Sequence, residues 1–238
     1  MRKVAFANDE YYHVYNRGVD KREVFLDNED FVRFLTCLRE FNRIDPIGSL
    51  YEKSFKDKHL ATYLGTKSPI GDLVPAIPVV EIIAYCLNPN HFHLILKQLQ
   101  ENGISKFMLK LSTGYTTYFN KKYKRNGSLF QGPFKAIHID SNEYLLYLSA
   151  YVNRNYFIHG YNDNLGTKSP NKSDDDWKFC SVLDYLGKRN GTLCNNSFIL
   201  NQFMQKGNST PLENYREFLN ANAQYFKDKK ELEKYCLE

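Results

Sequence analysis

Two apolar segments joined by a short turn constrain the fold more than any other part of this sequence. The segment "VVEIIAYCL", residues 79–87, is rich in β-branched residues, and "HFHLILKQL", residues 91–99, is a second apolar run. The intervening "NPN" has the composition of a tight turn. The pattern predicts a β-hairpin with His91 and His93 just past its tip.

The rest of the predicted core alternates strands with helices. Segment 11–18 alternates Tyr and Val with polar residues and ends at a glycine, and segment 128–139 is a strand that Gly132 and Pro133 interrupt. Apolar residues at helical spacing predict three helices, at about 28–41, 104–123 and 140–159. This order of elements is the split βαβ pattern with one extra helix. We therefore predict an α+β protein with a ferredoxin-like antiparallel sheet, helices on one face, and a small helical C-terminal tail.

The predicted organisation is one main domain followed by a tail. Residues 1–160 form the main domain, which contains an irregular insertion at about 44–79 that is rich in Pro and Gly. Residues 161–176 are polar and Asn-rich, which is typical of a linker, and 177–238 form the helical tail.

Composition favours a cytoplasmic location without a membrane anchor. The five cysteines have no paired spacing, which argues against a disulfide framework and against a zinc ribbon. No apolar run reaches the length of a membrane span, and the N-terminal segment lacks the apolar core of a signal peptide. The net charge of +5 is too small to identify a partner.

The two histidines of the hairpin are candidate metal ligands. Positions i and i+2 of a strand point to the same face, so His91 and His93 present two imidazoles side by side. Two such nitrogens can hold a divalent ion if a third oxygen or nitrogen donor completes the site. The alternative is a pair of hydrogen-bonded structural histidines at a hairpin tip.

The last predicted helix carries candidates for a nucleophile and a third ligand. Tyr151 and Asn155 are four residues apart and hence share one helical face. A phenol with its ordinary pKa of about 10 needs a nearby cation or base before it attacks efficiently at neutral pH. Tyr147, one turn earlier, is a rival nucleophile on spacing alone, and core packing is the alternative role for Tyr151.

A basic, aromatic segment is a candidate surface for single-stranded nucleic acid. Residues 102–139 contain no Asp or Glu, and their cations alternate with aromatic rings that could stack on exposed bases. A solvated helix face is the alternative. Arg17, at the end of the first strand, is a further candidate contact. The candidates in the segment are Lys106, Lys110, Tyr118, Lys121, Lys122, Lys124, Arg125 and Lys135.

Four blocks of the sequence, in order, resemble one family. They are "YHVYNRGVDKREVFLDNEDFVRFL", "NPNHFHLIL", "YFNKKYKRNGSLFQGPFKA" and "YLSAYVNRNYFIHG", and "WKFCSVLDYLGKRNG" is similar to the segment that follows them. The family is that of the REP-associated tyrosine transposases, a branch of the single-tyrosine His-hydrophobic-His (HUH) transposases.

The resemblance implies a metal-dependent DNA endonuclease and strand transferase. It implies that His91, His93 and Asn155 hold Mg²⁺ or Mn²⁺, and that Tyr151 is the nucleophile. It further implies single-stranded DNA with a hairpin as substrate, a covalent 5′-phosphotyrosine intermediate, a homodimer, and no nucleotide cofactor. Two alternatives remain: a nickase of the replication-initiator or relaxase type, and a non-catalytic or domesticated nucleic-acid-binding protein.

Overall fold

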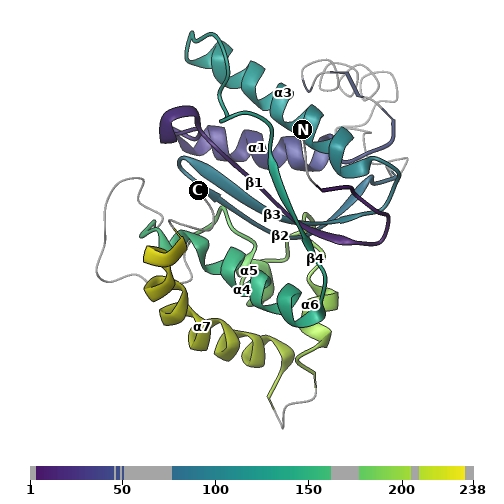
Figure 1. Ribbon diagram of the computed structural model, residues 1–238, viewed down its shortest axis with the longest axis vertical. Coiled ribbons are helices and arrows are strands. Elements are labelled where there is room, and N and C mark those ends of the chain that lie inside the picture. Colours follow the sequence, from purple (N-terminus) through teal and green to yellow (C-terminus); the bar gives the residue numbers. More distant parts are fainter. Residues whose placement is uncertain are drawn as a thin grey trace, which may run out of the picture.

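The computed structural model describes residues 4–45, 47–48, 50, 77–161, 177–204 and 209–233. In this part of the chain a four-stranded antiparallel sheet with the order β2-β3-β1-β4 lies between two layers of helices (Figure 1). The strands are β1 (Tyr11–Arg17), β2 (Val80–Asn88), β3 (His91–Gln98) and β4 (Lys135–Ile139). The helices are η1 (Val19–Lys21), α1 (Asn28–Glu40), α3 (Gly103–Lys122), α4 (Asn142–Ile158), α5 (Val182–Tyr185), α6 (Ser197–Asn201) and α7 (Pro211–Glu233).

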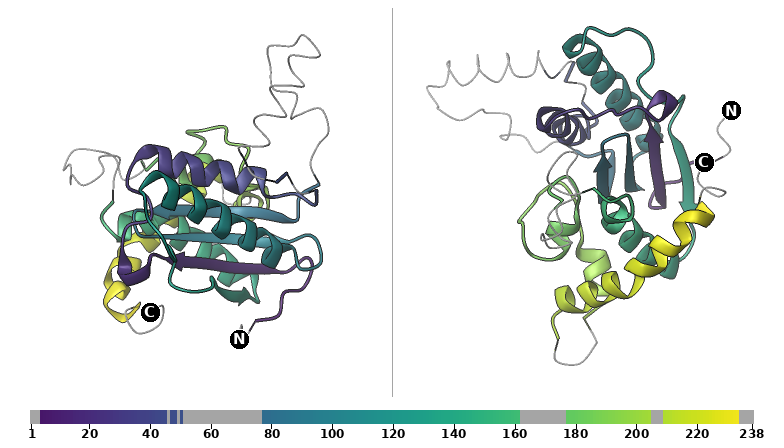
Figure 2. Two further views of the ribbon diagram at one scale, coloured as in Figure 1. Left: turned by 90° about the horizontal axis from the view of Figure 1, so that it is seen from above. Right: turned by 90° about the vertical axis from the view of Figure 1, so that its left-hand side faces the viewer.

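The alternation of β3 decides which helix covers which face of the sheet. Phe92 packs against Phe34 of α1, with ring centroids 5.1 Å apart, so α1 and α3 cover this face (Figure 2). His93 points the other way and meets Tyr151 of α4, with ring centroids 5.7 Å apart. The α+β class and the antiparallel sheet are confirmed, but the expected placement of all helices on one face is corrected. The central strands bury side chains on both faces, and α4 covers the second one.

The predicted helix limits agree with the structure because side chains fix where the helices begin. Asp27 accepts a hydrogen bond from the Asp30 backbone N–H at 3.0 Å before α1, and Ser141 accepts one from Tyr144 N–H at 3.2 Å before α4. The strand predicted at 128–139 is shorter than expected: β4 pairs continuously with β1 from Lys135 to Ile139, and before it Phe130 forms an isolated bridge with Gly18.

A C-terminal segment, residues 177–196, covers the outer edge of β2. Leu87 N–H donates to Phe179 O at 3.0 Å, Ser181 N–H donates to Tyr85 O at 2.9 Å, and Asn195 N–H donates to Ile82 O at 2.8 Å. These bonds satisfy backbone groups that an edge strand would leave open. The segment is therefore part of the same folded unit as the sheet.

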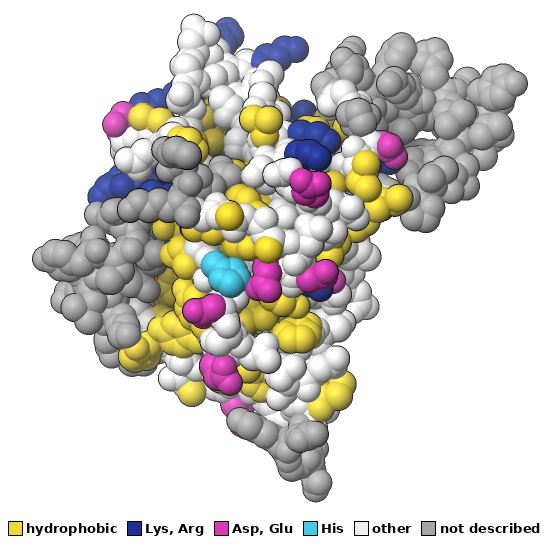
Figure 3. Space-filling view, turned by 45° about the vertical axis from the view of Figure 1, so that its right-hand side comes forward, with side chains coloured by type: hydrophobic (Ala, Val, Ile, Leu, Met, Phe, Trp, Pro, Cys, Tyr) yellow, Lys and Arg dark blue, Asp and Glu magenta, His cyan; other side chains and the backbone are white. Residues whose placement is uncertain are grey.

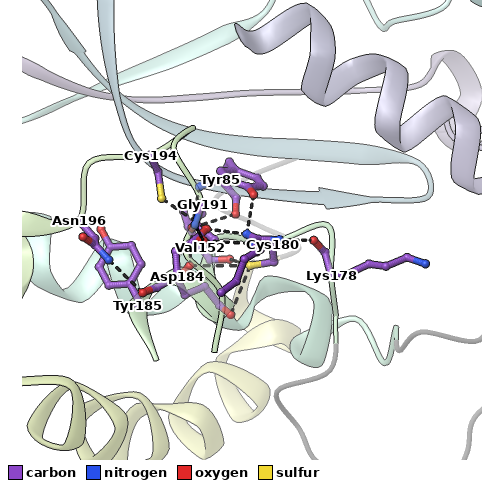
Figure 4. A network of polar contacts seen from close by, with 12 residues as sticks. Tyr85, Val152, Lys178, Cys180, Asp184, Tyr185, Gly191, Cys194 and Asn196 are labelled. Carbon is purple, nitrogen blue, oxygen red and sulfur yellow. Dashed lines mark hydrogen bonds and ion pairs between the residues drawn. The ribbon is translucent and has the colours of Figure 1, made fainter. Parts of the chain in front are cut away.

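One cation holds this segment in place. The Arg189 guanidinium donates to the Asp184 carboxylate at 2.5 Å, to the Tyr85 hydroxyl at 2.7 Å and to the Cys180 carbonyl at 2.9 Å. Figure 4 shows Tyr85, Cys180 and Asp184 drawn together in this network. The pKa of the Tyr85 phenol is raised by burial, so the phenol stays protonated in the network.

The predicted helical tail is helical, and its long helix packs along α4 (Figure 1). The Tyr215 hydroxyl of α7 lies 3.1 Å from Ser149 Oγ and accepts from Asn153 Nδ2 at 2.9 Å. Most of the predicted insertion, residues 51–76, and nearly all of the predicted linker, 162–176, lie outside the described residues. None of the helices in the described ranges has the length and apolar character that crossing a membrane requires.

Candidate active site

Tyr151 and Asn155 of α4 lie over His93 and His91 of β3. Four residues along an α-helix advance about 6 Å, and two residues along a strand advance about 6.6 Å. A helix that crosses the strand nearly in line can therefore set position i over one histidine and position i+4 over the other. The structure uses this match: Tyr151 meets the His93 ring, and Asn155 meets His91.

The contacts are close. Asn155 Oδ1 lies 3.0 Å from His91 Nε2, and the His91 and His93 rings are nearly perpendicular with centroids 5.2 Å apart. The Tyr151 ring meets the His93 ring edge to face, at an interplanar angle of 87°. Two imidazoles, an amide and a phenol from β3 and α4 thus converge at one place.

Two asparagines of the hairpin surround His91. Asn90 Oδ1 lies 2.6 Å from His91 Nδ1, and Asn88 Nδ2 lies 2.9 Å from His91 Nε2 and 2.5 Å from Asn155 Oδ1. Because a carboxamide oxygen only accepts, Asn90 fixes the His91 proton on Nδ1. His91 Nε2 then carries a lone pair, and this lone pair faces the Asn155 oxygen.

This donor set fits a divalent cation. The described residues hold no group of three or more His, Cys, Asp or Glu that could bind a metal, so a metal here would need the Asn155 amide oxygen beside the two imidazoles. The lone pairs of His91 Nε2 and Asn155 Oδ1 converge, and the Asn88 amide bridges them. Asn155 Nδ2 is buried and has no hydrogen-bond partner among the described residues, so the amide orientation is set through its oxygen. Imidazole nitrogen suits divalent transition-metal ions, and amide oxygen suits Mg²⁺ and Mn²⁺.

A third histidine, His13 of β1, lies beneath the site. His13 Nε2 is 2.8 Å from His93 Nδ1, and both side chains are buried. Burial lowers the pKa of His13 to about 3, and it lowers the pKa of His93 well below its usual value, helped by the neighbouring imidazoles of His13, His91 and His159. Both rings are therefore neutral at pH 7, which is the state that binds metals.

Tyr151 is covered in this conformation. Its residue is only 4% exposed, and the Phe226 ring of α7 lies 5.6 Å from its ring. Tyr147, the rival nucleophile, packs its ring against Tyr225 and Phe226 of α7 at 6.1 and 5.0 Å. The ring contact with His93 therefore distinguishes Tyr151 from Tyr147.

Two of the predicted DNA contacts lie on the same face of the sheet as the site. Arg17 is directly opposite His91 in the pairing of β1 with β3, and Lys135 of β4 is directly opposite Tyr15. The Lys135 ammonium lies 5.9 Å from the centre of the Tyr15 ring. Arg17 also donates from Nε to Gln131 Oε1 at 2.6 Å.

The other predicted DNA contacts belong to α3 and the turn after it, in the opposite helical layer. Most Lys and Arg side chains on the face shown in Figure 3 lie in the upper half of the molecule, where α3 runs. These contacts are Lys106, Lys110, Tyr118, Lys121, Lys122, Lys124 and Arg125.

Lys122 is engaged in a structural cluster. Its ammonium lies 2.7 Å from Asp27, 3.0 Å from Asp30 and 3.2 Å from Glu29. Burial opposes the charge on Lys122, but the hydrogen bonds to Asp27 and Asp30 outweigh burial and raise its pKa. The Tyr118 hydroxyl donates to Asp30 at 3.1 Å, so this predicted stacking residue is part of the same cluster.

Sequence reasoning did not single out three residues of the site. His13 belongs to the alternating strand "YYHVY". A histidine among the apolar and aromatic residues of this strand was the sequence feature that could have indicated a role in the site. Asn88 belongs to "NPN", which reads as a turn. His159 is eight residues after Tyr151, on the same helical face, and its ring lies 4.7 Å from the His91 ring.

Comparisons with known proteins find a family model and a solved structure that match this chain. Residues 77–155 match the family model described as "Transposase IS200 like". Among solved structures, "Structure of the REP associates tyrosine transposase bound to a REP hairpin" matches with a TM-score of 0.51 and 13% identity, over 83% of this chain and 94% of that chain. A search of curated proteins finds no match. The resemblance expected from the sequence is confirmed in these terms: the segment that matches the IS200-like transposase model contains His91, His93, Tyr151 and Asn155, and the chain has the fold of the solved transposase.

Proposed function

We propose that this chain is a metal-dependent endonuclease and strand transferase for single-stranded DNA, with Tyr151 as its nucleophile. One observation carries the proposal: α4 sets Tyr151 and Asn155 over His93 and His91 in a domain of the IS200-like transposase class. A nucleophile, two imidazoles and an amide oxygen are the parts that a metal-assisted phosphoryl transfer to tyrosine requires.

In the proposed reaction the Tyr151 oxygen attacks the phosphorus of a phosphodiester. The bond from phosphorus to the 3′ oxygen breaks, the phenol loses its proton, and the leaving oxygen gains one and becomes a free 3′-OH. The product is a 5′-phosphotyrosine. Rejoining reverses these steps with a 3′-OH as the attacking group. Because the ester bond energy is kept in the phosphotyrosine, no nucleotide cofactor is needed.

His91 Nε2, His93 and Asn155 Oδ1 would hold a Mg²⁺ or Mn²⁺ ion. Such an ion polarises the scissile phosphate and stabilises the charge that develops on its oxygens. Arg17 and Lys135, on the same face of the sheet, would bind phosphates next to the scissile one. Since His93 and His13 are kept neutral by burial, their lone pairs are not lost to protonation at pH 7.

The proposed substrate is DNA that folds into a hairpin with a single-stranded flank. The structural neighbour is described as bound to a REP hairpin, and the fold of this chain matches that protein. The exposed lysines of α3 and of the turn after it suit the flexible backbone of a single strand.

The test is a denaturing gel of the protein with labelled hairpin DNA from its own genomic flanks. Wild-type protein with Mn²⁺ should give a covalent protein–DNA adduct, and EDTA or Tyr151→Phe should abolish it. Tyr147→Phe is the matched control, because it removes a hydroxyl from the same helix one turn away, and it should keep the adduct. An adduct that persists in Tyr151→Phe would contradict the assignment of the nucleophile.

A binding protein without chemistry is the second candidate, and the burial of Tyr151 favours it. It predicts that hairpin DNA binds equally well in EDTA and after Tyr151→Phe, and that no adduct forms at any Mn²⁺ concentration.

A further inference from the structure

The contact between His13 and His93 is a linear hydrogen bond. The nitrogens are 2.8 Å apart, the ring centroids are 5.1 Å apart, and the ring planes differ by 17°. The centroid separation is close to the nitrogen–nitrogen distance plus two ring radii of about 1.1 Å each, as bond lengths near 1.33 Å imply. His13 Nε2 and His93 Nδ1 therefore point directly at each other, with the two rings nearly in one plane, and exactly one proton lies between them.

The sheet holds this geometry. Tyr15 is directly opposite His93 in the pairing of β1 with β3, and His13 is two residues away on the same face. This makes His13 the diagonal neighbour of His93, a position that long and aromatic side chains can bridge. His13 is 1% exposed and His93 is 6% exposed, so water competes little for the bond.

The shared proton has two possible positions with opposite consequences. If His13 Nε2–H donates, then neutral His93 carries its own proton on Nε2 and has no lone pair there. If His93 Nδ1–H donates, then His93 Nε2 keeps its lone pair on the side of the ring away from His13. Only the second arrangement lets His93 act as a ligand through Nε2 without losing a proton.

We propose that His13 is a positioning residue whose Nε2 accepts the Nδ1 proton of His93, and so keeps the Nε2 lone pair of His93 available for a divalent cation. This rests on the proposed function, in which His93 is a ligand. The bond to His13 is the one hydrogen bond that the described residues give the His93 ring. His13 is thus the described side chain that selects the tautomer of His93, while Asn90 does the same for His91.

The first test needs no metal. In ¹H–¹⁵N spectra of the metal-free protein that correlate ring carbon-bound protons with ring nitrogens, the His93 signals, assigned with His93→Gln, should have the pattern of the tautomer protonated on Nδ1. In His13→Phe the His93 ring should lose this fixed pattern. A wild-type His93 ring protonated on Nε2 overturns the proposal.

The second test measures Mn²⁺ binding by calorimetry. His13→Phe keeps a flat ring but removes the acceptor, and it should weaken binding by about 10–100-fold, the usual effect of losing the partner of a ligand. His13→Gln can place an oxygen where Nε2 was, and it should restore much of the affinity. Tyr15→Phe, which keeps the 5.7 Å ring contact with His93, is the matched control and should bind as the wild type does.

The outcomes separate this inference from the proposed function. If wild-type protein binds Mn²⁺ and His13→Phe binds it equally well, the positioning role is overturned and the metal site stands. If wild-type protein binds no Mn²⁺ and forms no adduct with DNA, the proposed function fails and this inference fails with it. Equal losses in His13→Phe and His13→Gln, in folded proteins, would also overturn the role of the acceptor.

Discussion

At the scale of single residues, the site is defined by a surplus of lone pairs. His91 Nε2 and Asn155 Oδ1 face each other at 3.0 Å, and the Asn88 amide group is the donor that lies between them. Two acceptors at this distance repel unless a positive group bridges them. In the metal-free protein the Asn88 amide therefore separates the two acceptors. A bound cation would take over this electrostatic role.

This gives a prediction for Asn88→Asp. The change replaces the bridging donor by a buried carboxylate, so the metal-free protein should lose stability, by about 1–3 kcal/mol for an unsatisfied buried group. Mn²⁺ should recover the loss, because the new carboxylate is an additional ligand. Melting temperatures measured in EDTA and in Mn²⁺ check this.

The matched control for that experiment is Asn16→Asp, a buried asparagine of β1 on the opposite face of the sheet. It should lose stability without recovery in Mn²⁺. If Mn²⁺ rescued both variants equally, the effect would not belong to the site.

The sequence shows which residues can act but not how they are held. His91, His93, Tyr151 and Asn155 could be named as candidates from spacing, because strand and helix periods are fixed and short, and the family resemblance assigned their roles. His13 and Asn88 could not, because their roles depend on which strands are neighbours and on a hydrogen bond between residues 80 positions apart. Spacing alone likewise does not separate Tyr147 from Tyr151, and the structure distinguishes them by the contact of the Tyr151 ring with the His93 ring.

At the scale of elements, the arrangement depends on α7 lying against α4. Phe226 is fully buried, and its ring is 5.6 Å from Tyr151 and 5.0 Å from Tyr147. Phe226 therefore covers part of the Tyr151 ring, and we expect a DNA strand that approaches Tyr151 to displace or bypass this part of α7. The C-terminal helix is thus part of the access route, which its sequence, read as a small tail, does not indicate.

Phe226→Ala should increase the initial rate of adduct formation in the gel assay. We expect an increase of up to about tenfold. This factor corresponds to a loss of about 1.4 kcal/mol in the free energy with which α7 packs over Tyr151. Phe203→Ala removes a buried ring of the same size that packs on Tyr215 and Phe218 instead. This control should lower stability without raising the rate, and a rate increase in both variants would indicate general loosening.

The strands could be predicted where the apolar pattern of their residues is continuous and no Gly or Pro interrupts it. The hairpin of β2 and β3 has nearly continuous apolar runs on both sides of one turn, and its limits agree with the structure to within about a residue. The strand predicted at 128–139 is reduced to five residues. Gly132 has a φ of +70° and Pro133 lacks an N–H, and they interrupt the pairing with β1: the first half of the segment forms an isolated bridge, Phe130 to Gly18, and the continuous ladder begins after Pro133.

At the scale of the whole molecule, positive charge is divided between two regions. Arg17 and Lys135 lie on the face of the site, and the cations of α3 lie in the opposite layer. A single strand that contacts both must pass around the sheet. Lys122 lies on α3, but we do not expect it to bind DNA, because its ammonium already forms ion pairs with three carboxylates.

Neutralising Lys121 and Lys124 should therefore weaken single-strand binding broadly and flatten its salt dependence. Each lost phosphate contact should reduce the slope of log K against log salt by about 0.7. Lys122→Gln should leave the slope unchanged and instead cost about 2–3 kcal/mol of stability, because the buried Asp30 carboxylate loses its cation. Binding titrations at several salt concentrations, with denaturant melts, distinguish these effects, and an altered slope in Lys122→Gln would contradict the division.

The covering of β2 by residues 177–196 has a consequence for how copies of this chain can associate. With that side of the sheet occupied, β4 is the remaining outer strand in the described part of the chain, and no described strand pairs along its far side. A second copy could pair its own β4 with this β4, and neither copy would then have an outer strand left for a third copy. Growth would stop at two, so the geometry permits a closed pair and forbids an endless ribbon.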